Sequence, residues 1–191
     1  MKTFKVNILL IIVNILLVVS SIYHVNLLFA AQPKAGEKLP ALTLPAPHYE
    51  AGKRSLGIDQ NSPKFTISDF KSELIIIEVI GVYCPQCFKQ APSFNNLYGR
   101  LNKGKMKGRV AMFAIAAGGT EPEIDQLIKS GQYNFPVISD MKYEAHKTLG
   151  EPKTPFTIIC RSDGVIVETH LGVIEDIDKF YGEIKSLLSK P

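Results

Sequence analysis

"GVYCPQCFKQAP", residues 81–92, holds two of the chain's three cysteines, with one proline and one glutamine between them. A continuous apolar run, "LIIIEVI" (74–80), precedes it and predicts a strand that is buried on both faces. A helix with one buried stripe is then predicted over residues 85–101, from apolar residues at helical spacing: Phe88, Ala91, Phe94, Tyr98 and Leu101. The two cysteines are therefore expected at the junction between a buried strand and a helix.

This position gives the two cysteines different chemistry. The amino terminus of a helix carries unpaired N–H groups and a partial positive charge, which stabilise a thiolate. We expect Cys84, at the junction, to be the exposed thiol of low pKa, and Cys87, one turn further on, to be shielded. Cys84 would attack a substrate disulfide and Cys87 would resolve the mixed disulfide. Pro85 suits the first helical turn, where its missing N–H has no intrahelical partner.

Two other interpretations of the pair stay open. A zinc site normally needs four ligands, and the sequence offers no second cysteine pair, while His146 and His170 are single and distant. A purely structural disulfide would close so short a loop that it gains little chain entropy. A redox-active pair is therefore favoured. Cys160, in "TIIC", is expected to be a small buried hydrophobic residue, with a second redox thiol as the alternative.

The amino terminus predicts export. Residues 8–31 contain no acid, lysine or arginine, and Lys2 and Lys5 precede them. As a helix, this segment would span the roughly 30 Å apolar core of a bilayer. We expect a transmembrane signal anchor, with a signal peptide cleaved at Ala30 or Ala31 as the alternative. Either way the rest of the chain lies outside the cytoplasm, in the periplasm or on the outer face of the membrane.

Charge adds little to this prediction. The net charge of +4 is mild and the lysines are scattered. The densest basic stretch, "LNKGKMKGR" (101–109), has no interleaved aromatic residues and is expected to be a solvated loop. Nucleic-acid binding, which needs a basic stripe or patch, is not expected.

The remainder of the chain predicts one α/β domain. Residues 32–65, rich in Pro, Gly and Ala, are expected to be a linker with a lead-in strand, and residues 66–191 the domain. Strands are predicted at 74–80, 109–117 and 135–140, with a hairpin of strands 156–161 and 165–170. Helices are predicted at 85–101, 121–130 and 142–149 and at the carboxyl terminus, with Thr120 and Glu123 as a capping box. This order describes a central mixed β-sheet flanked by helices.

Several features, taken in order, carry a resemblance to a known family. They are the strand–CxxC–helix unit of Cys84 and Cys87, Pro92 eight residues after Cys84, and Glu78 six residues before it. "KTPFTI" adds Thr154-Pro155 just before a strand. Over residues 36–189 the chain resembles the thioredoxin-fold, TlpA/ResA-like group of exported thiol–disulfide oxidoreductases (redoxin or thioredoxin-domain proteins).

The resemblance implies roles for the residues around the cysteines. Glu78 would be a buried carboxyl of raised pKa that accepts or returns the proton of Cys87, unless its side chain points to solvent. Pro155 would follow a cis peptide bond, so that the backbone of Thr154 faces an incoming substrate chain; the alternative is an ordinary trans proline at the start of a strand. Tyr83 would shield one side of the Cys84 thiolate, with a packing residue as the alternative, and with Pro85 it is expected to contact substrate.

The chain also departs from the family. It has no tryptophan, although the family usually places one beside the CxxC. Gln90 stands where many cytochrome-maturation members have an acid, and Phe156 follows the proline where they often have glutamate or threonine. These differences put in doubt an apocytochrome substrate but leave the thiol chemistry unaffected.

We therefore predict a protein disulfide reductase that needs no cofactor or metal and works through a reversible Cys84–Cys87 disulfide. Its partners would be disulfide-containing proteins and an upstream thiol donor, and it would be a monomer. One rival is a thiol peroxidase of the peroxiredoxin type. That family requires proline and threonine or serine where this chain has Ile77 and Gly81. Another is a non-catalytic copper or metal carrier, which would need a dedicated histidine that the sequence does not reveal.

Overall fold

The computed structural model describes residues 31–189. The apolar segment 8–31, predicted to be a signal or an anchor, lies outside this range except for Ala31. Among the helices that are described, none is long and apolar enough to cross a membrane.

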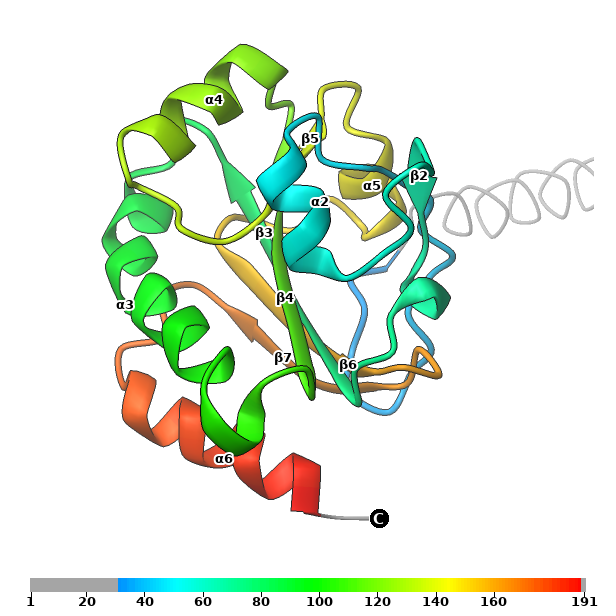
Figure 1. Cartoon of the computed structure of the whole chain (residues 1–191), viewed down its shortest axis with the longest axis vertical. Coiled ribbons are helices and arrows are strands. Elements are labelled where there is room, and N and C mark those ends of the chain that lie inside the picture. The colour runs from blue at the N-terminus through cyan, green and yellow to red at the C-terminus, as the bar shows by residue number, and fades with distance from the viewer. Residues whose placement is uncertain (1–30, 190–191) are drawn as a thin grey trace, which may run out of the picture. The chain divides into compact units, whose positions relative to one another are not determined.

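The described chain forms five main strands and a set of helices (Figure 1). The strands are β1 (Leu44–Pro45), β2 (Lys64–Phe65), β3 (Leu74–Gly81), β4 (Val110–Ala117), β5 (Val137–Asp140), β6 (Phe156–Arg161) and β7 (Ile166–Leu171), of which β1 and β2 form a separate short pair. The helices are α2 (Glu50–Leu56), α3 (Pro85–Leu101), α4 (Glu121–Lys129), α5 (Glu144–Thr148) and α6 (Ile177–Ser189). From β3 onward, the predicted order of strands and helices is confirmed.

The main sheet has the order β5-β4-β3-β6-β7. Strands β3, β4 and β5 run parallel, whereas β6 is antiparallel to β3 and β7 is antiparallel to β6. The predicted mixed sheet is therefore confirmed. Since β3 is the central strand, the turn that follows it brings the cysteine pair to the middle of one edge of the sheet.

Strand β3 is buried on both faces, and its side chains alternate between two cores. Ile76 and Ile80 pack into one core with residues of α3 and α6, including Phe94 and Phe180. The intervening residues Ile75, Ile77 and Val79 pack into the core on the opposite face. Because side chains alternate along a strand, Glu78 shares the face of Ile76 and Ile80 and is directed toward α3.

Helix α3 has the predicted bounds, but its buried face is rotated relative to the prediction. Phe88 was expected in the buried stripe, yet it is 36% exposed, whereas Cys87 and Gln90 are fully buried. The buried residues of α3 recur every three or four positions and therefore share one face of the helix: Cys87, Gln90, Ala91 and Phe94. This face directs Cys87 toward the sheet. Pro92 lies inside the helix on its exposed side.

The segment predicted as linker and lead-in strand packs onto the sheet domain. One compact unit begins at Gln32, and Leu42 and Leu44 are buried in the core opposite α3. Helix α2 within this segment was not predicted. Its C-cap is Gly57, whose positive φ of 68° is the left-handed conformation that favours glycine.

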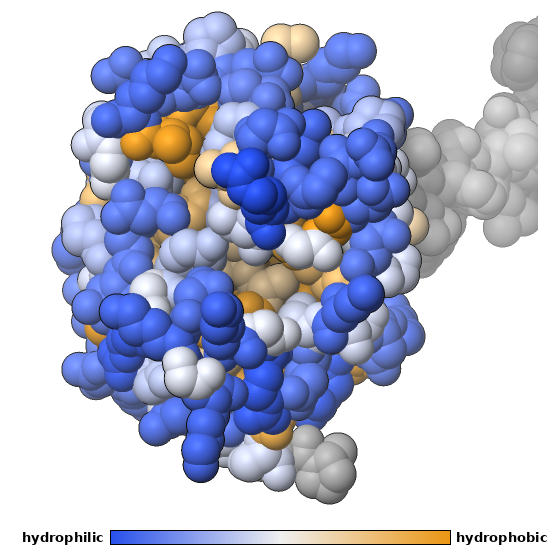
Figure 2. Space-filling model, viewed as in Figure 1, coloured by the Kyte–Doolittle hydropathy of each residue, from blue (hydrophilic) through white to orange (hydrophobic). Residues whose placement is uncertain are grey.

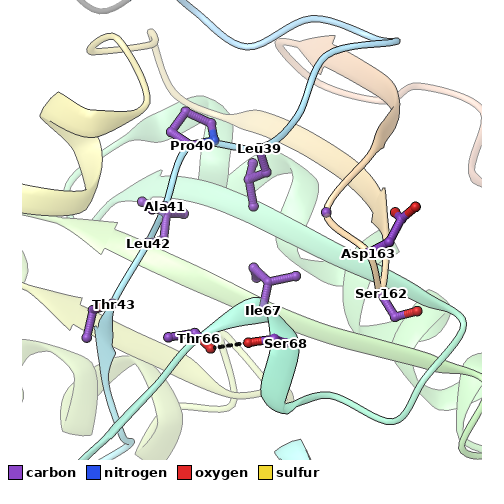
Figure 3. Close-up of a pocket in the computed structure, with 11 residues that line it drawn as sticks. Leu39, Pro40, Ala41, Leu42, Thr43, Thr66, Ile67, Ser68, Ser162 and Asp163 are labelled. Carbon is purple, nitrogen blue, oxygen red and sulfur yellow. Dashed lines mark hydrogen bonds between the residues drawn. The ribbon is translucent and has the colours of Figure 1, made fainter.

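The domain surface is largely hydrophilic on the face in Figure 2. One surface pocket, of about 330 Å³, is lined by residues 39–43, 66–68 and 162–164 (Figure 3). The turn at 162–164 follows Arg161, which pairs with the first residue of β3, Leu74. This pocket therefore lies at the end of the sheet opposite the cysteines, and Asp163 is the one titratable residue in its lining.

Candidate active site

Cys84 and Cys87 form a disulfide at the amino terminus of α3, with their Cα atoms 5.2 Å apart. Cys84 is the N-cap residue and Pro85 begins the helix. The backbone N–H of Cys87 donates a hydrogen bond to Sγ of Cys84 over 3.2 Å. The same N–H and the helix dipole would stabilise negative charge on Cys84 after the disulfide opens.

Cys84 and Cys87 differ in exposure to solvent, as the sequence predicted. Cys84 is partly exposed, whereas Cys87 is fully buried against the core of α3 and the sheet. A partner molecule can therefore approach Cys84 but not Cys87. This asymmetry fits an attacking thiol and a resolving thiol.

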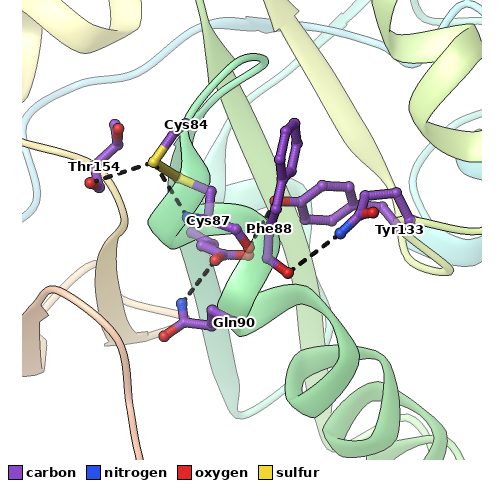
Figure 4. The surroundings of a disulfide bond; sticks show 8 residues. Cys84, Cys87, Phe88, Gln90, Tyr133 and Thr154 are labelled. Atoms are coloured by element: carbon purple, nitrogen blue, oxygen red, sulfur yellow. Dashed lines mark hydrogen bonds between the residues drawn. A yellow bond between two sulfur atoms is a disulfide. The ribbon is translucent and has the colours of Figure 1, made fainter.

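The predicted loop before β6 lies beside Cys84. The peptide bond between Thr154 and Pro155 is cis, and the carbonyl oxygen of Thr154 lies 3.5 Å from Sγ of Cys84 (Figure 4). Behind the loop, the N–H of Gly172 donates to the carbonyl of Pro155 over 2.8 Å. Leu171, the last residue of β7, is 53% exposed next to this contact. The loop and Leu171 thus offer backbone and apolar surface at the exposed cysteine.

Glu78 is fully buried on the face of the sheet that carries α3, so its side chain does not point to solvent. Nε2 of Gln90 donates a hydrogen bond to Oε1 of Glu78 over 2.7 Å. Burial raises the pKa of the Glu78 carboxyl to about 8, and the hydrogen bond from Gln90 opposes that rise. The carboxyl is therefore mainly protonated at neutral pH and can give or take a proton near pH 8.

Gln90 was noted in the sequence only as a departure from a family pattern. In the structure it joins three elements, because its Oε1 accepts a 2.7 Å hydrogen bond from the backbone N–H of Ile174. The amide thus links α3, the centre of β3 and the loop before α6. Its helical spacing from Cys87 could have revealed its burial, but its two partners depend on tertiary structure.

Tyr83, the residue predicted to shield the Cys84 thiolate, lies at the surface. Its ring is 78% exposed, and its hydroxyl donates a 2.6 Å hydrogen bond to Glu123 at the start of α4. That bond, together with those from Thr120, lowers the pKa of Glu123 to about 2. The residue before the exposed cysteine is therefore held toward α4, next to the disulfide and open to solvent.

The third cysteine takes no part in this arrangement. Cys160 lies on β6, fully buried in the core opposite α3, and burial raises its pKa to about 12. Its predicted place as a small buried residue is confirmed. Across residues 31–189, no group of three or more histidine, cysteine or acidic side chains is arranged to hold a metal ion.

The sequence over residues 34–184 matches the Redoxin family. Among curated proteins, the chain is 30% identical over 110 residues to the thiol-disulfide oxidoreductase ResA of Bacillus thuringiensis subsp. konkukian, covering 58% of this chain and 61% of that protein. It is 24% identical over 144 residues to sporulation thiol-disulfide oxidoreductase A of Bacillus subtilis, covering 75% and 81% of the two chains.

Solved structures share the fold. StoA from Bacillus subtilis superposes with a TM-score of 0.56 at 16% identity, covering 78% of this chain and 98% of that one. A secreted disulfide oxidoreductase of Mycobacterium tuberculosis, homologous to Escherichia coli DsbE, gives a TM-score of 0.57 at 15% identity, covering 76% and 95%. The predicted thioredoxin-like fold and the resemblance to the ResA-like group are thereby confirmed. With a family match that extends through the whole sheet and both cysteines, the chain belongs to the Redoxin family.

Proposed function

We propose that this protein is a thiol–disulfide oxidoreductase that reduces disulfides in partner proteins through reversible opening of the Cys84–Cys87 bond. One observation carries the proposal: the disulfide caps α3 with Cys84 accessible and Cys87 buried. The ResA and StoA relatives, named as thiol-disulfide oxidoreductases, support the same chemistry.

The cycle begins with the reduced protein. The Cys84 thiolate attacks one sulfur of a substrate disulfide, forms a mixed disulfide, and expels the other substrate sulfur as a thiolate that takes a proton from solvent. Cys87 then loses its proton to the Glu78 carboxylate and attacks Sγ of Cys84. This second step restores the Cys84–Cys87 bond and releases the remaining substrate sulfur, which is protonated in turn. An upstream dithiol reverses these steps and returns the pair to the reduced state.

The surroundings of Cys84 supply the substrate contacts in this proposal. The backbone of Thr154, at the cis-Pro155 loop, would pair with an extended substrate segment, as an added strand does. Tyr83 and Pro85, both exposed, would flank the same segment. The partner is thus a polypeptide with an accessible disulfide.

We further propose that the protein is exported and anchored to the membrane by residues 8–31, and that it acts as a monomer. The absence of charge from that apolar segment supports the anchor, and the similarity to a secreted M. tuberculosis oxidoreductase supports export. The peroxidase and metal-carrier alternatives have weaker support. Ile77 and Gly81 occupy the positions where a peroxidase block needs proline and threonine, and a metal carrier would need a dedicated histidine that the sequence does not reveal.

Reduction of insulin by the domain in the presence of dithiothreitol tests this function. We expect the wild-type protein to accelerate the reaction, Cys84→Ser to abolish the acceleration, and Cys160→Ser to retain it as a matched control. Full activity in Cys84→Ser would contradict the proposal.

A further inference from the structure

Three polar side chains form a row across the sheet beneath the disulfide. In the antiparallel pairing of β3 with β6, Glu78 stands opposite Thr157, and in the pairing of β6 with β7, Thr157 stands opposite His170. Directly opposed residues on neighbouring strands project from the same face of a sheet. Glu78, Thr157 and His170 therefore lie side by side on the face covered by α3 and α6.

The inner part of this row contains two buried polar atoms without partners. Oε2 of Glu78 and Oγ1 of Thr157 make no hydrogen bond with any residue that the structure describes. Their side chains are 0% and 1% exposed. An unpaired buried polar atom destabilises the fold, and native proteins commonly join two such atoms through an ordered water molecule. Their adjacency suits a shared hydrogen-bonding partner.

The outer end of the row reaches the surface. His170 lies on β7, the edge strand, and is half-buried. Its Nε2 lies 3.3 Å from the carbonyl oxygen of Val173. A carbonyl can only accept, so Nε2 carries the hydrogen in this contact and Nδ1 of the neutral ring remains an acceptor.

Other groups around the row set its electrostatics. Glu168 is two residues from His170 on the same strand face, and Lys179 and Glu183 of α6 lie near Glu168. On the inner side, Gln90 donates a hydrogen bond to the other carboxyl oxygen of Glu78, Oε1. Tyr133, whose hydroxyl donates to the carbonyl of Cys87, is also buried, and the nearby Glu78 contributes to the rise of its pKa.

We propose that Thr157 and His170 form the proton route between the buried Glu78 and solvent. This inference rests on the proposed function, because that cycle requires Glu78 to be a carboxylate before it can accept the proton of Cys87. The proton leaves Oε2 of Glu78, passes through the Thr157 hydroxyl and one bridging water to the His170 ring, and goes from the ring to bulk water. During re-reduction the opposite transfer reprotonates Glu78, which can then give a proton to the Cys87 thiolate as it is released. Thr157 and His170 are positioning residues, since neither touches the reacting sulfur atoms.

The reaction of the reduced protein with excess 5,5′-dithiobis(2-nitrobenzoate) separates the two thiol steps. The first coloured thiolate is released when Cys84 attacks, and the second when Cys87 resolves the mixed disulfide. Thr157→Val removes the hydroxyl with little change of shape, Thr157→Ser retains it, and Thr169→Val is a control on the opposite face of β7. His170→Ala is measured with and without added imidazole.

We expect the first release to keep its wild-type rate in all variants. The second should slow by about ten-fold or more in Thr157→Val and His170→Ala, within the range that proton-transfer groups contribute. Thr157→Ser and Thr169→Val should remain close to wild type, and imidazole should restore His170→Ala but not Thr157→Val. Wild-type rates for the second release in both Thr157→Val and His170→Ala would overturn the proton route alone. A wild-type protein that releases neither equivalent would overturn the proposed function and the route with it.

Discussion

Gln90 donates a 2.7 Å hydrogen bond to Glu78, and both side chains are fully buried beneath the cysteine pair. The same glutamine accepts from the N–H of Ile174, so its amide orientation is determined by one donor and one acceptor. This pair connects the helix that carries the disulfide to the centre of the sheet. The protonation behaviour of Glu78 therefore depends on Gln90 as well as on burial.

Gln90→Leu should destabilise the oxidised protein by about 1–3 kcal/mol, because it leaves a buried carboxyl and a buried N–H without partners. It should also raise the pKa of Glu78 further, since the lost hydrogen bond opposes the effect of burial. Urea denaturation measures the first effect. Gln86→Leu, on the exposed side of the same helix, is the matched control. A free energy of unfolding equal to that of wild type would show that the two hydrogen bonds of Gln90 do not stabilise the fold.

Glu78→Gln should change how stability depends on pH. Burial raises the pKa of Glu78 in the folded protein to about 8, above its value in the unfolded chain. Between about pH 4.5 and 8 the unfolded chain releases this proton while the folded protein retains it, so wild-type stability falls as pH rises. The slope from this group is at most about 1.4 kcal/mol per pH unit.

The oxidised Glu78→Gln variant should lose that component. Urea denaturation gives the free energy of unfolding of both proteins at pH 5 and at pH 8. We expect the value for the variant, relative to that of wild type, to be higher at pH 8 than at pH 5. Disulfide-bonded cysteines do not titrate, so they do not contribute to the difference. Parallel pH profiles for the two proteins would show that Glu78 titrates in the folded state as it does in the unfolded chain.

Alkylation of the reduced protein should distinguish the three cysteines. Cys84 is partly exposed at a helix amino terminus, whereas Cys87 and Cys160 are fully buried. We expect iodoacetamide to modify Cys84 first, with a reactive thiolate already formed below the usual thiol pKa of about 8.5. Peptide mass spectrometry after a short exposure gives the order. Equal labelling of Cys84 and Cys160 would contradict the exposed-thiolate interpretation.

Tyr83→Phe should affect recognition of large substrates more than folding. The hydrogen bond from Tyr83 to Glu123 holds an exposed ring next to Cys84, so its loss should leave the thermal unfolding midpoint nearly unchanged. If the ring contacts substrate, KM for a protein disulfide should rise several-fold while the rate with a small aromatic disulfide stays the same. Glu123→Gln, which keeps a hydrogen-bond acceptor for the hydroxyl, is the control. An equal change for both substrates would place the effect in the thiol chemistry instead.

The sequence predicted the parts of this fold that depend on local pattern. The apolar run at 74–80 and the helical spacing after Cys84 identified β3 and α3, and Thr120 with Glu123 identified the start of α4, where the capping box is present. Helix α2 was missed because proline and glycine around residues 32–65 favoured a loop. Its signals were nevertheless present, with Glu50 in the first turn and Gly57 just after the end.

The parts that could not be predicted depend on contacts between distant segments. The exposure of Phe88 is set by how α3 packs on the sheet, which the helical spacing of apolar residues does not determine. The bonds from Gln90 to Ile174 and from Tyr83 to Glu123 join residues far apart in the chain. The alignment of Thr157 with Glu78 requires the strand register, which the sequence pattern does not specify.

The reduction potential of the Cys84–Cys87 couple decides whether the protein reduces or oxidises the disulfides of its partners. It can be measured by equilibrating the domain with glutathione or dithiothreitol buffers at pH 7 and quantifying the free thiols of Cys84 and Cys87. A protein that reduces partner disulfides should give a value close to that of thioredoxin, roughly −270 mV. A value near roughly −120 mV, typical of a strong oxidant, or a bond that does not open reversibly, would contradict the account.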